Sequence, residues 1–309
     1  MDFGWHLPCY GPLATRENLI LVAREAEARG LESVFVSDHV ALPFEPKTAY
    51  GGSRTGTFPV PPTDTFLEPL TALALVAAVT ERVKLGTTVL VLPHRHPVLA
   101  AKTIATLDSL SGGRVIVGAG VGWLRDEIEL FGVPHERRGA WSDEALDVMK
   151  RCWADERSKH RGEFFRFDDV GCYPKPAQDP YPPLWIGGSG PAACRRVARF
   201  GDGFHAAWSP PEIMGEQIRD VWRACSDVGR LGTDLTFSVR AGYGIRERPS
   251  TGATASLVGP PAFIAEQIQR YADVGVSHLV LEATLRDLDQ HLALMRRFTE
   301  DIRPLTESA

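Results

Sequence analysis

A carboxylate and an imidazole stand side by side at Asp38 and His39, directly after the β-branched run 33–36. A histidine titrates near neutral pH, so His39 could donate or accept the proton that accompanies hydride transfer. The neighbouring carboxylate could hydrogen-bond the N–H groups of a cofactor ring. In an isolated dipeptide, Asp38 could equally cap a loop while His39 packs in the core. Both interpretations are open on these two residues alone.

A second chemical signal is the segment Gly187-Gly188-Ser189-Gly190-Pro191, which follows a short apolar run at 184–186. Glycines expose backbone N–H groups, and a proline is typical of the first turn of a helix, whose positive end attracts anions. We therefore expect a phosphate site here, because a plain tight turn would need fewer glycines. The partial match to a dinucleotide-binding pattern is weak, since it lies in the middle of the chain and no acidic residue follows at the required distance.

Three further patterns carry less information. His94 and His96 could share one face of an extended segment, but no carboxylate cluster or H-E-x-x-H motif accompanies them, so we expect no metal site. Ser189 lies in G-G-S-G-P, which breaks the G-x-S-x-G pattern of serine hydrolases at its last position. Aromatic residues near predicted strand ends could line a planar ring, although most aromatics at such places belong to the core. They are Trp5, Trp123, Phe204 and Trp208.

The elements that must position these residues alternate along the whole chain. Short β-branched runs predict strands at 3–7, 33–36, 83–92, 114–117, 184–186, 203–206, 235–241 and 278–281. Amphipathic segments between them predict helices at 17–29, 67–79, 98–110, 123–131, 142–153, 192–200, 212–228, 261–272 and 287–302. Eight such units predict an α/β fold, a (β/α)8 TIM barrel, whose site residues gather after the strands. A doubly wound sheet with a second domain would require a dinucleotide fingerprint after the first strand, where the chain has Pro8-Cys9-Tyr10-Gly11-Pro12 instead.

Insertions interrupt the alternation after the second and fourth strands. We expect one domain over residues 1–309, with a Pro/Gly-rich insertion at 42–66 that folds over the barrel mouth as a lid and is flexible at 50–52. The smaller insertion contains a predicted hairpin at 163–173 with a turn at Asp168 and Asp169. Glycines cluster at 118–122 and 187–190, on one rim of the predicted barrel, where the backbone is expected to approach a ligand.

Composition excludes several classes of protein. The chain has 309 residues, of which 44% are hydrophobic and 24% charged, as in ordinary globular proteins. The net charge of −5 argues against binding to nucleic acid or to an anionic membrane. The five cysteines are scattered without a C-x-x-C pair, which favours free thiols in a reducing compartment. No signal peptide or membrane-length apolar run is visible, so we expect a cytoplasmic protein.

Six segments together resemble the bacterial luciferase-like monooxygenase superfamily, and within it the actinobacterial oxidoreductases that depend on the deazaflavin coenzyme F420. The segments that carry the resemblance are residues 37–40, 81–93, 95–97, 105–114, 118–124 and 183–190. Their order and spacing fit from Met1 to about Pro304. The resemblance is specific for the superfamily and less so for the cofactor and the substrate.

The resemblance implies a (β/α)8 barrel with F420, or alternatively FMN, deep in its mouth, and hydride transfer to a small organic substrate. It implies that Asp38 contacts the polar edge of the ring and that His39 is the catalytic acid or base. It also implies a non-prolyl cis peptide at Thr88-Val89, a bulge behind the ring. The expected cofactor-binding residues are Asp38, Thr88, Val89, Gly120, Trp123, Gly187, Gly188 and Ser189. Relatives are commonly homodimers, so we expect one here.

Two positions depart from the sugar-phosphate dehydrogenases of this superfamily. Trp123 stands where those enzymes have a catalytic glutamate, and Pro43 stands where they have a tryptophan. Glucose 6-phosphate is therefore not the expected substrate, and His39 lacks its usual helpers.

Two alternatives remain open. One is an FMN-dependent monooxygenase, because a flavin activates oxygen and a deazaflavin does not. The other is a non-catalytic flavin- or deazaflavin-binding protein, against which Asp38 and His39 argue.

Overall fold

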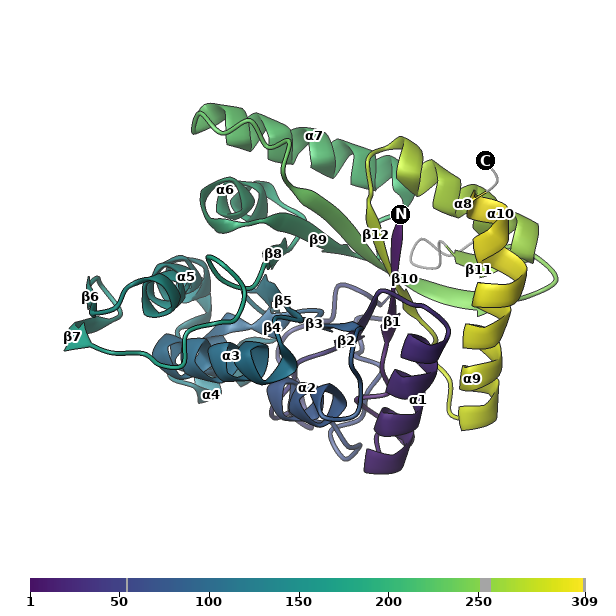
Figure 1. Ribbon diagram of the computed structural model, residues 1–309, viewed down its shortest axis with the longest axis horizontal. Coiled ribbons are helices and arrows are strands. Elements are labelled where there is room, and N and C mark those ends of the chain that lie inside the picture. Colours follow the sequence, from purple (N-terminus) through teal and green to yellow (C-terminus); the bar gives the residue numbers. More distant parts are fainter. Residues whose placement is uncertain (54, 251–256, 308–309) are drawn as a thin grey trace.

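A closed barrel of parallel strands forms the centre of the molecule, as the alternation predicts (Figure 1). The computed structural model describes residues 1–53, 55–250 and 257–307. The first strand pairs with both the second and the last, which closes the sheet and confirms the (β/α)8 TIM barrel. In barrel order the strands are β1 (Asp2–His6), β2 (Ser33–Val36), β3 (Lys84–Thr87), β5 (Val115–Gly120), β8 (Leu184–Gly187), β9 (Gly203–Ala207), β10 (Thr236–Ile245) and β12 (His278–Glu282).

Helices surround the barrel (Figure 1). Local sequence sets many of their ends: Pro97, Pro191 and Pro261 each occupy a first turn, and Gly112, with φ 73°, ends one helix. The helices are α1 (Arg16–Ala28), α2 (Pro69–Ala77), α3 (Pro97–Ser111), α4 (Arg125–Leu130), α5 (Arg138–Ala154), α6 (Pro191–Phe200), α7 (Pro211–Asp227), α8 (Pro261–Asp273), α9 (Leu288–Arg297) and α10 (Arg303–Glu307). The predicted final helix at 287–302 corresponds to α9 and a π-helical turn, η3 (Phe298–Ile302), and the helical chain continues beyond it as α10.

The strand predicted at 83–92 is interrupted. After β3 comes a cis peptide between Thr88 and Val89, which confirms the bulge expected from the resemblance. The chain then continues as β4 (Leu90–Val91) and a 3-10 turn, η1 (Leu92–His94). β4 then resumes the pairing of β3 with β5, with the register shifted by one residue.

Glycines surround the bulge. A Cβ on Gly118 would lie 1.9 Å from the Thr87 carbonyl oxygen, and a Cβ on Gly120 would lie 2.5 Å from Val89 Cγ2. A Cβ on Gly187 would lie 2.8 Å from Val89 Cγ1. The prediction that the fourth strand ends at 117 is wrong, because β5 continues through Gly118 and Gly120. These glycines therefore have a packing role, which is to leave room for the bulge.

The predicted hairpin exists, but its turn was misplaced. Strands β6 (Ser158–Arg161) and β7 (Arg166–Val170) pair antiparallel, so the turn lies between them and Asp168 and Asp169 lie in β7. The Glu144 carboxylate of α5 accepts hydrogen bonds from the backbone N–H groups of residues 163–165 and so stabilises the actual turn. A short strand not anticipated from the sequence, β11 (Leu257–Gly259), pairs in parallel with the end of β10.

A chain of polar side chains crosses the barrel interior. Thr88 Oγ1 lies 2.8 Å from His205 Nε2, and His205 Nδ1 lies 2.9 Å from Ser238 Oγ. Ser238 Oγ lies 3.0 Å from His278 Nδ1, and His278 Nε2 lies 2.8 Å from Ser33 Oγ. Since every member is buried and has a partner, the chain satisfies polar groups that would otherwise destabilise the core. It runs from the bulge to a cavity of about 470 Å³ beside the N-terminal ends of the strands, which Ser33 and His278 help to line.

Two sequence-based expectations concern the whole chain. All five cysteines are buried and unpaired, as predicted from their scattered positions. Across residues 1–53, 55–250 and 257–307, no helix is both long enough and apolar enough to cross a membrane.

Candidate functional site

The residues singled out from the sequence lie on one rim of the barrel, where the carboxyl ends of the parallel strands meet. Asp38 and His39 follow β2, and Thr88 and Val89 follow β3. Gly120 ends β5 with Trp123 just beyond it, and the segment 187–189 lies at the end of β8. The close approach of Val89 to Gly120 and Gly187 shows that the ends of β3, β5 and β8 are neighbours.

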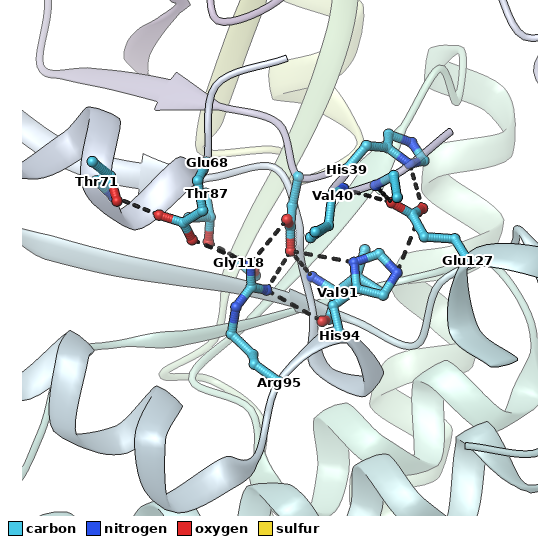
Figure 2. A network of polar contacts seen from close by, with 12 residues as sticks. His39, Val40, Glu68, Thr71, Thr87, Val91, His94, Arg95, Gly118 and Glu127 are labelled. Atoms are coloured by element: carbon cyan, nitrogen blue, oxygen red, sulfur yellow. Dashed lines mark hydrogen bonds and ion pairs between the residues drawn. The ribbon is translucent and has the colours of Figure 1, made fainter. Parts of the chain in front are cut away.

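His39 is held by a glutamate that the sequence did not single out (Figure 2). His39 Nδ1 lies 2.6 Å from Glu127 Oε2, and Glu127 Oε1 also accepts hydrogen bonds from the backbone N–H groups of Val40 and Ala41, at 2.5 and 3.0 Å. Burial acts to raise the pKa of Glu127, but the hydrogen bond and charge of His39, with smaller contributions from His94 and the Ala41 N–H, together lower it below its usual value. An ionised carboxylate only accepts hydrogen bonds, so the proton is on Nδ1 of His39. Nε2 is therefore the nitrogen that can exchange a proton with a ligand.

His94 lies between two carboxylates (Figure 2). Its Nε2 is 3.5 Å from Glu127 Oε2, and its Nδ1 is 3.9 Å from Asp38 Oδ2. Burial lowers the pKa of His94, and the charges of Glu127 and Asp38 only partly offset this effect. His94 is thus a neutral imidazole that lies behind the His39–Glu127 pair. His96, by contrast, is exposed and accepts a hydrogen bond from the Val98 N–H at the start of α3, so the two histidines do not share a face.

Within the described part of the chain, no three His, Cys, Asp or Glu side chains are grouped so as to hold a metal ion.

The Asp38 carboxylate faces Arg95 and the backbone of β4. Arg95 Nη1 and Nη2 lie 2.5 and 3.1 Å from its two oxygens, and the Val91 N–H donates a bond of 2.8 Å. Burial acts to lower the pKa of Arg95, but the hydrogen bonds and charges of Asp38 and Glu68 together raise it above its usual value. These partners tie the end of β2 to the segment after β3. Contact between Asp38 and the polar edge of a cofactor ring stays a prediction.

Aromatic rings from the predicted lid cover His39. The His39 ring centroid lies 4.8 Å from that of Phe58 and 5.3 Å from that of Phe66. Trp123 approaches His39 from the β5 side at 6.0 Å, and Tyr50 lies 4.9 Å from Trp123. We call the four rings of Tyr50, Phe58, Phe66 and Trp123 the aromatic cage. Between 42 and 66, Arg54 lies outside the described residues.

A second buried ion pair adjoins the bulge. Arg240 of β10 donates two hydrogen bonds to Glu282 of β12, at 2.7 and 2.6 Å. Arg240 also donates to Ser37 Oγ at 2.9 Å and to the Thr88 carbonyl at 3.1 Å. Burial acts to raise the pKa of Glu282, but the opposing effects, of which the charge of Arg240 is the largest, together lower it to about 2. This ion pair therefore connects four strands around the Thr88 carbonyl.

The segment predicted to bind phosphate has an open backbone. Gly188 has φ 132°, and Ser189 and Gly190 are exposed. Among the described residues, no side chain caps the first turn of α6, and a Cβ on Gly190 would meet nothing within 4 Å. Uncapped N–H groups at a helix N-terminus favour an anion. The geometry is compatible with a phosphate here, although its binding is not tested.

Glu127, Arg240 and Glu282 were not predicted from the sequence. One signal was available for the last two: both charged residues fall within or beside runs that were predicted to be strands of the barrel, where a charge that is buried is usually paired. Glu127 had no such signal, because Asp126 and Glu129 are also acidic and only the fold decides which one points inward.

A barrel of this kind, with polar residues gathered at the carboxyl ends of its strands, is typical of enzymes, and comparison with known proteins identifies the family. Residues 1–251 match the family model described as luciferase-like monooxygenase. The chain belongs to this family, as the resemblance implied.

Individual relatives include an uncharacterized protein of Mycobacterium tuberculosis, which is 34% identical over 280 residues, covering 89% of this chain and 90% of the relative. The F420-dependent glucose-6-phosphate dehydrogenase of Intrasporangium calvum is 27% identical, with 98% of each chain covered. Among solved structures, an F420-dependent secondary alcohol dehydrogenase in complex with an F420-acetone adduct superposes with a TM-score of 0.80, at 18% identity over 99% of this chain and 98% of the other. This last similarity concerns the fold alone.

Proposed function

We propose that this protein is an oxidoreductase that transfers a hydride between a small organic substrate and coenzyme F420, with His39 as the proton partner. The observation that carries the proposal is the buried His39–Glu127 pair at the barrel mouth, with 2.6 Å between Nδ1 and Oε2. A histidine oriented by an ionised carboxylate is an arrangement suited to general acid–base catalysis. The F420-dependent relatives support the choice of cofactor.

The residues at the rim are compatible with a phosphorylated ring cofactor. The uncapped α6 N-terminus with Gly187, Gly188 and Ser189 would hold a phosphate, and Thr88, Val89, Gly120 and Trp123 would lie along the ring. A bound deazaflavin supplies the hydride chemistry. Arg240 holds the Thr88 carbonyl in place, so the bulge residue has a fixed position when a cofactor binds.

In this proposal His39 moves the proton and Glu127 fixes its tautomer. When an alcohol is oxidised, its carbon-bound hydrogen leaves with two electrons, and the hydroxyl proton passes to Nε2 of His39. The negative charge of Glu127 stabilises the imidazolium that results. The ring of Phe66, which packs against His39, helps to exclude water from this exchange. In the opposite direction His39 returns the proton to the carbonyl oxygen.

The decisive test is a calorimetric titration of the purified protein with F420 and, separately, with FMN. We expect F420 to bind at least about tenfold more tightly, which corresponds to about 1.4 kcal/mol. Tight binding of FMN alone, with oxygen consumption, would support a flavin monooxygenase, as the family description allows. Binding of F420 without turnover of any alcohol or carbonyl compound would support a non-catalytic binding protein. A homodimer stays a prediction.

A further inference from the structure

We propose that the substrate is an uncharged alcohol or carbonyl compound with an aromatic or alicyclic ring, which binds against Trp123 in the space that Phe58 and Tyr50 now occupy. The inference rests on the proposed function and adds the substrate class to it.

The first observation is the way in which the protein covers its own proton-transfer residue. Phe58 packs 4.8 Å from His39 and 5.6 Å from Trp123, and Tyr50 packs 4.9 Å from Trp123 and 5.0 Å from Phe58. A substrate must reach His39, so it must replace at least part of these contacts. The groups that pack best against Trp123 and His39 in the free protein are themselves six-membered carbon rings. The surface beneath them is therefore complementary to a ring.

The second observation is the fixed position of Trp123 in contrast to the two lid rings. Trp123 lies between β5 and α4, and Leu124 and Ile128, which follow it, are buried in the core. Tyr50 and Phe58 lie in the connection between β2 and α2, whose described residues form no helix or strand apart from an isolated bridge at Phe66. Trp123 thus keeps a fixed position in the site, whereas Tyr50 and Phe58 lie on a segment that can move away from it.

The lid is anchored on both sides of these rings. Before them, the Lys47 N–H donates to Asp126 Oδ2 at 3.0 Å, and Thr48 Oγ1 accepts from the Arg125 N–H at 3.3 Å. After them, the Leu67 N–H donates to the Cys9 carbonyl at 2.8 Å. The segment between these anchors contains Gly51, Gly52 and Gly56. Because glycine tolerates large backbone changes, this segment can move Tyr50 and Phe58 together while both anchors hold.

The third observation is electrostatic. Two buried arginines adjoin the site, and each is already paired: Arg95 with Asp38, and Arg240 with Glu282. Glu127 carries a negative charge next to His39. A phosphorylated substrate placed against Trp123 would bring a double negative charge close to Glu127 and among aromatic rings, which is costly when the two arginines that adjoin the site in the described part of the chain are already paired. An uncharged hydroxyl or carbonyl group avoids this cost and still reaches His39.

The experiment compares two neutral ring compounds, 1-phenylethanol and acetophenone, with glucose 6-phosphate. Each is titrated into the purified protein by calorimetry, with and without added F420, and F420 reduction by each alcohol is measured separately. We expect saturable binding of both ring compounds and none of glucose 6-phosphate. Trp123→Ala should weaken the binding of acetophenone about tenfold. Phe58→Ala should strengthen it several-fold, because the competing ring is gone.

Trp222→Ala is the matched control. Trp222 is half exposed on α7 and outside the aromatic cage, so its loss should leave ligand affinity unchanged. Equal effects of Trp123→Ala and Trp222→Ala would overturn the inference, as would binding of glucose 6-phosphate in preference to the ring compounds. Ring binding without reduction of F420 would contradict the proposed function and leave the ligand class standing. Reduction of F420 by glucose 6-phosphate, and by neither ring compound, would support the proposed hydride transfer and contradict the ligand class.

Discussion

The Glu127 carboxylate determines the orientation of His39 in the candidate site. Its two oxygens are shared among the His39 imidazole, the backbone N–H groups of Val40 and Ala41, and the nearby His94 ring. A carboxylate with so many donors stays ionised, and it fixes both the ring orientation and the tautomer of His39. Glu127 is thus a positioning residue, since it acts through His39.

Replacing Glu127 with glutamine tests this role. The glutamine side chain has the same size, but its neutral amide could not stabilise a charged His39. We expect Glu127→Gln to lower the single-turnover rate of F420 reduction by roughly 10²-fold, within the range of general acid–base contributions, and to change F420 affinity by less than about twofold. Stopped-flow absorbance and calorimetry measure the two quantities.

His39→Ala provides the reference for that measurement, because it removes the proton partner itself. The rate of the double variant should equal that of His39→Ala, since Glu127 acts only through the imidazole. Additive losses in the double variant would show that Glu127 has an independent role. A normal rate in Glu127→Gln would remove it from the mechanism.

At the level of elements, the bulge after β3 depends on the glycines of neighbouring strands. Gly118→Ala would place a methyl group 1.9 Å from the Thr87 carbonyl oxygen, a backbone atom that cannot move aside easily. We expect this variant to lower the free energy of unfolding by roughly 1–3 kcal/mol or more. Urea denaturation monitored by circular dichroism measures the change.

Gly190→Ala is the control at this scale. Its φ of −111° suits any residue, and an added Cβ would meet nothing within 4 Å among the described residues. The free energy of unfolding should therefore change by less than about 0.5 kcal/mol. If both variants lost stability equally, room for the bulge would not be the reason for Gly118.

The order of the elements could be predicted from the sequence, because strands and helices with distinct hydrophobic periods alternate through the chain. The strand at β2 was predicted to the residue. The break between β3 and β4 could not be found from periodicity, since Thr88 and Val89 continue a β-branched run, and only the resemblance indicated a bulge. The turn at Asp168 and Asp169 was wrong because Glu144, distant in sequence, stabilises a different turn.

The candidate site was only half predictable for a similar reason. Asp38 and His39 stand together after a strand, so their place on the rim followed from the fold. The partners of these two residues come from other units: Arg95 from the connection after β4, Glu127 from α4, and Phe58 from the lid. Contacts between units depend on packing, which no local pattern of residue types records.

For the molecule as a whole, buried histidines set the response to acid. Burial lowers the pKa of His6, His205 and His278 to about 3, and that of His291 to about 4. In the unfolded chain a histidine has a pKa near 6.5, so between about pH 6.5 and pH 4 the unfolded chain binds protons that the folded protein does not. The folded state is therefore favoured fully above pH 6.5 and loses stability as the pH falls.

The expected loss is up to about 1.4 kcal/mol per pH unit for each of these histidines, as an upper limit. Urea denaturation at pH 7.5 and pH 5 measures it in a range where most carboxylates remain ionised. His291→Gln should reduce the dependence of the free energy of unfolding on pH, because one buried imidazole is removed. Trp5 Nε1 donates a hydrogen bond of 2.8 Å to His291 Nε2, and the side-chain oxygen of glutamine can accept it instead. A free energy of unfolding that is constant over this range would contradict the neutral state of the four rings.

Closure of the barrel has a consequence for how the chain is made. β1 is held between β2 and β12, with Trp5 opposite Val34 on one side and Leu281 on the other. On the ribosome, the first strand is synthesised long before its last neighbour exists. Until β12 emerges, one edge of β1 and one edge of β10 present unpaired backbone groups, the usual starting point for association between chains. During synthesis the sheet therefore stays open between β1 and β10 until residues 278–282 have left the exit tunnel.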